Sequence, residues 1–150
     1  MVDLSHITEA DKAYLAGIID GEGCIDINVR RGKCGVGTHS ARLVITQSNQ
    51  PFLVYLKDMW GGLGSVHGLG GDRPGKKIYR WSITNNQCVF ILRQALQYLR
   101  IKRPQADLAI ELQLSRNKNG ARLSQETLDY RGDIKRKVSD LNRMEYIYDA

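Results

Sequence analysis

Nine residues near the N-terminus constrain the fold of this chain more than any other stretch. They run from Leu15 to Gly23, with the sequence LAGIIDGEG, and end a helix that we expect to begin at Thr8. Ala13, Gly17 and Gly21 lie four residues apart, so they share one face of that helix. A glycine inside a helix costs about 1 kcal/mol relative to alanine. Because small residues at this spacing let another backbone pack closely, we expect a second helix against this face.

No other segment of the chain has a matching face of small residues, so the expected neighbour is the same helix of a second copy. Crossing on a two-fold axis would bring Asp20 and Glu22 of both copies together. Carboxylates at a helix C-terminus repel unless a cation neutralises them, and Mg²⁺ prefers oxygen ligands. Such a site suits metal-assisted cleavage of a phosphodiester. A short helix that ends in glycine, with Glu22 merely solvated, explains the same residues.

The hydrophobic period predicts the remaining elements. The first helix has a Thr8–Asp11 capping box and an apolar stripe of Tyr14, Leu15, Ile18 and Ile19. After this helix, the apolar residues recur at every second position. Strands are expected over 25–30, 41–46, 64–67 and 76–84, and helices over 52–60, from a cap at Asn85 or Asn86 to Leu99, over 105–115 and over 124–143, with a polar break at 117–120. This order, α-β-β-α-β-β-α-α-α, predicts one α+β domain over residues 1–150, with antiparallel hairpins and helices on one face of the sheet.

Composition favours a polyanionic partner. The 150 residues include 22 Lys and Arg against 16 Asp and Glu, a net charge of +6, which favours nucleic acid without proving it. Three scattered cysteines argue against a disulfide scaffold or a zinc site. No apolar run is long enough for a membrane span, and the N-terminus has no signal-peptide pattern. We therefore expect an intracellular protein with no membrane partner, in the cytoplasm of an archaeon or bacterium or in an organelle.

The nonapeptide resembles the signature of the LAGLIDADG homing endonucleases and matches it at six of nine positions. The three differences, at Ile18, Gly21 and Glu22, are mild. The expected element order also resembles the fold of that family through about Arg103, whereas the last thirty residues are only weakly constrained. Further similarity lies in Tyr14, in the segment VITQ at 44–47 and in residues 100–108.

The resemblance implies a site-specific, intron-encoded DNA endonuclease of the homing type. Such an enzyme cuts both strands of a long pseudo-palindromic target across the minor groove by divalent-metal-dependent hydrolysis, leaving short 3′ overhangs. Members with one signature are homodimers, in agreement with the dimer expected from Gly17 and Gly21. Mg²⁺ is the expected cofactor, and Mn²⁺ or Ca²⁺ can occupy the same site. The alternatives are a nucleic-acid-binding relative without cleavage, such as an intron RNA maturase or a transcription regulator, and a basic interaction domain with no nucleic-acid role.

The resemblance assigns roles around the signature. Glu22 takes the position of the metal-binding acid, where its extra methylene relative to Asp shifts the expected ion. The backbone carbonyl of Gly21 lies near that ion, and Asp20 supports the helix end. Gln47 would position a water, although it could simply end its strand and cap the next helix.

Two further positions complete the implied site. Lys102 matches a basic residue that would offset charge on the phosphate, a role that Arg100 or Arg103 could fill instead. A second basic residue of the family site corresponds to Pro51 in this chain. The site therefore departs from the family pattern at this point.

The outward side chains of the strands would face DNA in the major groove. Arginine suits guanine, asparagine suits adenine, aspartate suits cytosine and an apolar group suits the thymine methyl; contact with phosphate or with water alone is the alternative for each. The strand residues are Asp26, Asn28, Arg30, Arg42, Val44, Thr46, Ile78 and Arg80. The expected contacts to the DNA backbone are Lys33, His39, His67, Arg73, Lys76 and Lys77.

Overall fold

The structure, a computed structural model, describes residues 2–32, 37–70, 75–118 and 124–144, with only the backbone for residues 117 and 118. The predicted order of elements is confirmed. In chain order these are α1 (Glu9–Glu22), β1 (Gly23–Arg31), β2 (Gly37–Gln47), α2 (Gln50–Met59), β3 (Ser65–Leu69), β4 (Ile78–Thr84), α3 (Asn85–Ala95), a 3-10 turn (Leu96–Tyr98), α4 (Arg103–Lys118) and α5 (Gln125–Arg143).

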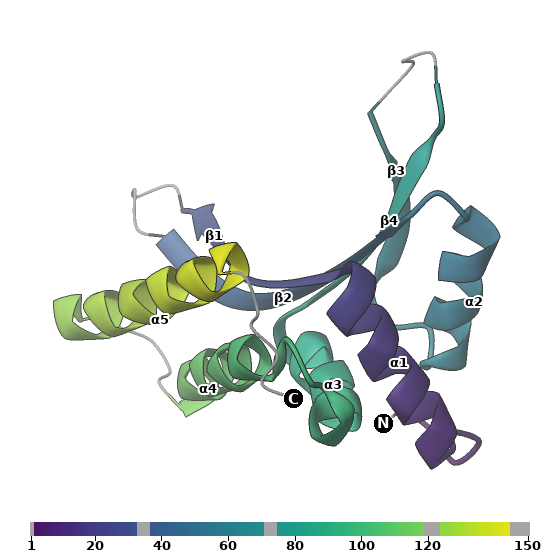
Figure 1. The fold of residues 1–150 in the computed structure, drawn as a ribbon. Helices are drawn as coiled ribbons and strands as arrows, with labels where there is room; N and C mark the ends of the chain where they lie inside the picture. Colours follow the sequence, from purple (N-terminus) through teal and green to yellow (C-terminus); the bar gives the residue numbers. More distant parts are fainter. Residues whose placement is uncertain (1, 33–36, 71–74, 119–123, 145–150) are drawn as a thin grey trace.

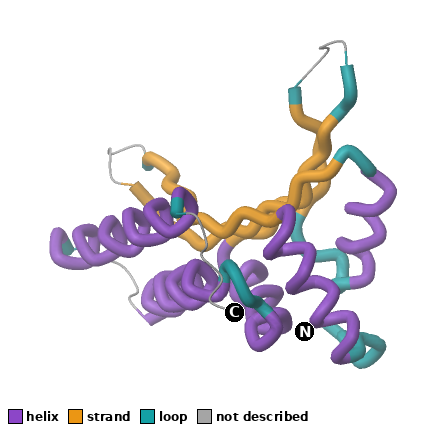
Figure 2. The backbone as a smooth tube through the Cα atoms, in the orientation of Figure 1, coloured by secondary structure: helices purple, strands orange, loops and turns teal. Residues whose placement is uncertain are grey.

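The four strands form one antiparallel sheet in the order β1-β2-β4-β3. Figures 1 and 2 show the sheet as a curved band with the helices gathered on one side, while the β3–β4 hairpin projects beyond them. The core lies between the helices and the sheet. It is built from the inward members of each strand, such as Ile25, Leu43 and Trp81, and from the apolar faces of the helices. The opposite face of the sheet is left open, as the sequence predicts.

Helix α1 begins and ends where the sequence predicts. Thr8 and Asp11 form the capping box, with the Asp11 N–H donating to Thr8 Oγ1 at 3.1 Å and the Thr8 N–H to Asp11 Oδ2 at 2.8 Å. At the other end, a Cβ on Gly23 would lie 2.7 Å from the Ile19 carbonyl oxygen. Glycine is therefore required where the chain passes directly from helix to strand.

Helix α1 has two different apolar faces, whereas the sequence predicts a single stripe. Leu15, Ala16 and Ile19 are fully buried in the core. Tyr14, which belongs to the expected stripe, is 56% exposed. It lies beside Gly17 on a face that no other part of the described chain covers, because a Cβ built on Gly17 would meet no atom within 4 Å.

Two strand predictions are corrected. Val29 was expected inward and shares the face of Ile27, opposite His39, but its side chain is 36% exposed rather than buried. The strand expected from residue 76 begins at Ile78, so Lys76 lies in the loop before β4. Lys33 and Arg73 lie outside the described residues.

Two helix predictions are corrected as well. Neither Asn85 nor Asn86 caps α3: Thr84 occupies the N-cap, and Asn85 is the first helical residue, with a positive φ of 57°. The polar residues from Asn117 do not break α4, which continues through Lys118. One turn earlier, Gln113 Oε1 accepts the Ala41 N–H at 3.2 Å, which ties this part of α4 to β2. Among the described helices, none combines the length and the apolarity needed to cross a lipid bilayer.

Candidate functional site

The end of the signature helix brings two predicted site residues into direct contact. Gln47, the last residue of β2, donates its Nε2 to both carboxylate oxygens of Glu22, at 3.0 and 2.8 Å. Its Oε1 accepts the Ser48 N–H at 2.9 Å, which fixes the orientation of the amide. Gln47 therefore holds the acid in place, whereas the resemblance assigns it to a water. The Glu22 side chain itself remains exposed.

Asp20 holds the short connection between the 3-10 turn and α4. Its Oδ2 accepts the backbone N–H of Arg100 at 2.9 Å, and its Oδ1 accepts those of Ile101 and Lys102 at 3.2 and 3.0 Å. Three N–H groups of one turn therefore converge on one carboxylate of α1. These bonds place Lys102 against the end of the signature helix.

Replacing Asp20 with alanine should destabilise the protein by about 1–3 kcal/mol, the cost of leaving hydrogen-bond donors without a partner. Urea unfolding followed by circular dichroism measures the loss. Asp20→Asn is the matched control, because its remaining oxygen can still accept the Ile101 and Lys102 N–H groups, and it should cost less. Equal stability of Asp20→Ala and the wild type would show that this turn does not depend on the carboxylate.

Lys102 points its ammonium group at the C-terminal end of α1. Nζ donates to the carbonyl of Ile19 at 3.0 Å and also to the carbonyl of Gly23, the residue after Glu22. Burial lowers the pKa of Lys102, an effect that Cys24 and Asp20 partly oppose. A cation at a helix C-terminus is favourable. The structure therefore places a half-buried positive charge next to the acidic end of the signature.

Glu22 and Gln47 lie at the rim of an apolar pocket on the open face of α1. Tyr14, Ile18 and Phe52 are its large side chains, and Ala13 and Gly17 complete the lining. Gly21 belongs to the same face, and no atom lies within 4 Å of a Cβ built on it. The three small residues predicted to share a face thus form a shallow, uncovered surface that leads directly to the acid.

The open face of the sheet carries the predicted DNA contacts in transverse rows that the strand register defines. One row is Asp26, Arg42 and Thr84, and another is Thr46, Arg80 and His67. Arg80 is partly exposed, and its buried Nε has no hydrogen-bond partner among the residues that the structure describes. Asn28, Arg30 and Ile78 lie on the same face.

Four predicted contacts differ from a free, outward side chain. Asp26 and Arg42 pair with each other, through Nε at 2.8 Å and Nη2 at 2.5 Å, and this hydrogen bonding raises the pKa of Arg42. Cross-strand register alone would have revealed this pair. Val44 lies on the predicted face but is only 7% exposed. His39 is two residues before Ala41 in β2, so both side chains lie on the helix-covered face of the sheet. Burial and nearby cations lower the pKa of His39 there.

The donor set at the helix end fits a divalent cation only in part. Both oxygens of Glu22 are hard donors of the kind that Mg²⁺ prefers, and the carboxylate is exposed and already oriented. Within the described residues, however, no group of three His, Cys, Asp or Glu side chains is placed to hold a metal ion. Further ligands would have to be backbone carbonyls, such as that of Gly21, or come from a second copy, DNA or water.

Comparison with solved structures places this fold among the homing endonucleases. The homing endonuclease I-CvuI, solved with the I-CreI target and Mg, has a TM-score of 0.73 and 20% identity over 93% of this chain and 87% of its own. The archaeal intron-encoded I-Vdi141I, solved with DNA, has a TM-score of 0.75 and 18% identity over 94% and 90%. I-SmaMI, bound to cleaved DNA, has a TM-score of 0.64 and 23% identity over 86% of this chain but 43% of its own.

The sequence comparison identifies the family. The profile of the LAGLIDADG endonucleases matches residues 15–102, from the signature through Lys102. The chain therefore belongs to the LAGLIDADG endonuclease family. Comparison with curated protein sequences gives no match.

Proposed function

We propose that this chain is a site-specific DNA endonuclease of the homing type that acts as a homodimer. The observation that carries the proposal is the junction at Glu22. There an oriented, exposed carboxylate lies between the uncovered small-residue face of α1 and the open cationic face of the sheet. A second copy packed on the first face would pair the two acids, and DNA on the second face would reach them.

In this proposal, each residue at the end of the signature helix has a separate role. Glu22, with the Gly21 carbonyl beside it, would hold a divalent cation, Mg²⁺ foremost, which when bound stabilises charge on the scissile phosphate and activates water. Gln47 fixes the carboxylate. Lys102 adds a positive charge beside the reacting phosphate, with little freedom to move because two carbonyls hold it. Fixed charges of this kind act without reorganising during the reaction.

The two-fold axis of the proposed dimer also predicts the form of the target. Each copy of β1 runs away from Glu22 with its polar residues on the open face, so the two sheets would contact two half-sites of opposite direction. The site should therefore be a long, approximate palindrome with both cuts near its centre. The family resemblance further implies cuts across the minor groove that leave short 3′ overhangs. Solved relatives bound to DNA support this use of the fold.

Arg80 offers a direct test of base reading. Arg80→Ala should relax base preference at one symmetric pair of positions, at a cost of about 1–3 kcal/mol, because Arg80 lies on the open face of the sheet between Thr46 and His67. Selection from a library of target variants measures the preference. A uniform loss of affinity across all variants would instead assign Arg80 to the DNA backbone.

Cleavage of a plasmid library with and without Mg²⁺ tests the activity itself. Discrete linear products that need the cation support the endonuclease. The alternative is a nucleic-acid-binding relative that no longer cleaves, and Pro51 at the position of a family basic residue is the observation that favours it. Salt-sensitive DNA binding with no cleavage in Mg²⁺ or Mn²⁺ would establish that alternative.

A further inference from the structure

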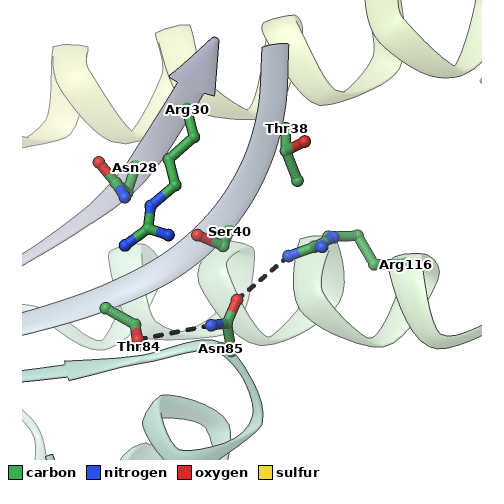
Figure 3. A pocket seen from close by; sticks show the side chains of 7 residues that line it. All are labelled: Asn28, Arg30, Thr38, Ser40, Thr84, Asn85 and Arg116. Carbon is green, nitrogen blue, oxygen red and sulfur yellow. Dashed lines mark hydrogen bonds between the residues drawn. The ribbon is translucent and has the colours of Figure 1, made fainter. Parts of the chain in front are cut away.

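A polar pocket lies at the outer end of the open sheet face, on the side where β4 ends and α3 begins. Its lining combines two guanidinium groups, two carboxamides and three hydroxyls, and contains no carboxylate. Figure 3 shows the guanidinium groups of Arg30 and Arg116 directed toward the same space, from β1 and from α4. The residues are Asn28, Arg30, Thr38, Ser40, Thr84, Asn85 and Arg116.

The Arg116 side chain is oriented by the unusual backbone of Asn85. With a φ of 57°, Asn85 adopts the left-handed conformation, which asparagine tolerates better than most residues. Its Oδ1 accepts from Arg116 Nη1 at 3.2 Å, and its Nδ2 donates to Thr84 Oγ1 at 3.5 Å. The guanidinium is therefore held through Nη1, and within the described residues its other N–H groups have no hydrogen-bond partner.

The charge around the pocket is positive. Among the ion pairs of the described residues, none includes Arg30 or Arg116. On the other side of β2, burial and the nearby Arg131, Lys135 and Arg116 keep the pKa of His39 below its ordinary value. Several cations thus share this end of the molecule, so an anionic group placed in the pocket would be electrostatically favoured.

The position of the pocket selects one kind of anion. Arg30 is seven residues beyond Gly23 along β1, or about 23 Å from the Glu22 end at 3.3 Å per residue. At 3.4 Å per base step, this is about seven base pairs from the centre of the target. Neighbouring strands are about 4.8 Å apart, and the major groove is about 12 Å wide, so β1 and β2 together would occupy most of its width. Arg116 lies beside the edge of β2 and would therefore face the rim of the groove.

From this geometry we infer that the pocket binds a backbone phosphate of the DNA in the outer part of each half-site, with Arg116 as its main ligand and Asn85 as a positioning residue. The inference rests on the proposed function for its partner, duplex DNA. It adds a contact from α4 to a surface that the sequence assigned to the strands alone.

The test is the salt dependence of binding to a pool of random duplexes of about 30 base pairs. Losing one phosphate contact reduces the magnitude of the negative slope of log K against log[salt] by about 0.9, so Arg116→Ala should show this decrease for each bound protomer. Arg116→Lys, which keeps the charge, should restore most of the slope. The control is Arg136→Ala on α5, an exposed arginine paired with Asp133 at 3.2 Å, which should leave the slope unchanged.

A wild-type slope in Arg116→Ala, an equal decrease in Arg136→Ala, or a changed sequence preference in place of a changed slope would each overturn the inference. Asn85→Gly keeps the left-handed backbone but removes the acceptor, and should lower affinity about twofold to threefold with little change in slope; an unchanged affinity would refute the positioning role. These readouts do not need cleavage. A chain that binds the pool but never cuts would therefore refute the endonuclease proposal while leaving the pocket intact.

Discussion

Glu22→Gln should lower double-strand cleavage by about a thousandfold or more while specific DNA binding stays within a few fold of the wild type. The substitution keeps the volume of the side chain and its place beside Gln47, but it removes the charge that attracts a divalent cation. Stabilisation by a metal ion contributes several kcal/mol to such a transition state, and each 1.4 kcal/mol is about tenfold in rate. Single-turnover cleavage in Mg²⁺ and a gel-shift assay in Ca²⁺ separate the two effects.

Glu126→Gln, in the exposed first turn of α5, provides the matched control, because it removes the same charge far from the signature. It should cleave like the wild type. Cleavage by Glu22→Gln at the wild-type rate would remove Glu22 from the site. A parallel loss of binding would indicate that the carboxylate positions DNA or the dimer rather than the reaction.

Much of the fold follows from local pattern. The change of hydrophobic period at Gly23, the capping box at Thr8 and the turn glycines predict the element order, because each depends on contacts within a few residues. The failures depend on tertiary structure. Val29 has the right alternation, but near the end of β1 its side chain stays 36% exposed. Tyr14 has the right spacing for the core, but α1 presents that side to the outside of the chain.

The candidate site was predictable in a different way. Gln47 and Lys102 came from the family resemblance, whereas Glu22 also followed from the small-residue face of its helix. No local pattern would have joined the three, since β2 and the turn before α4 reach α1 only in the folded chain. The Asp26–Arg42 pair was accessible from strand register but was missed. Arg116 was not predictable, because its partner Asn85 was expected to cap a helix rather than to turn into the open face.

Gly17→Val should convert the proposed dimer to a monomer without unfolding the chain. Within one chain, no atom lies within 4 Å of a Cβ on Gly17, and valine has a slightly better helix propensity than glycine. The fold of the monomer should therefore keep or slightly gain stability. In a two-fold interface, the same patch meets itself, so both copies would carry the clash.

Overpacking costs about 1–3 kcal/mol at each site. Two sites should therefore raise the dissociation constant of the dimer by at least about thirtyfold. The separation of the two helices would also move the two copies of Glu22 apart, so double-strand cleavage should fall with dimerisation. Sedimentation velocity over a range of concentrations and thermal unfolding measure the two properties separately.

Gly132→Val is the matched control for this prediction. Gly132 also lies inside a helix, α5, and a Cβ there likewise meets no atom within 4 Å, but it lies far from the small-residue face. The control should remain dimeric and active, which isolates the effect of position from that of adding a valine. A wild-type protein that is monomeric at micromolar concentration and cuts only one strand would overturn both the interface and the symmetric mechanism, because an unpaired Glu22 would then be sufficient for the chemistry.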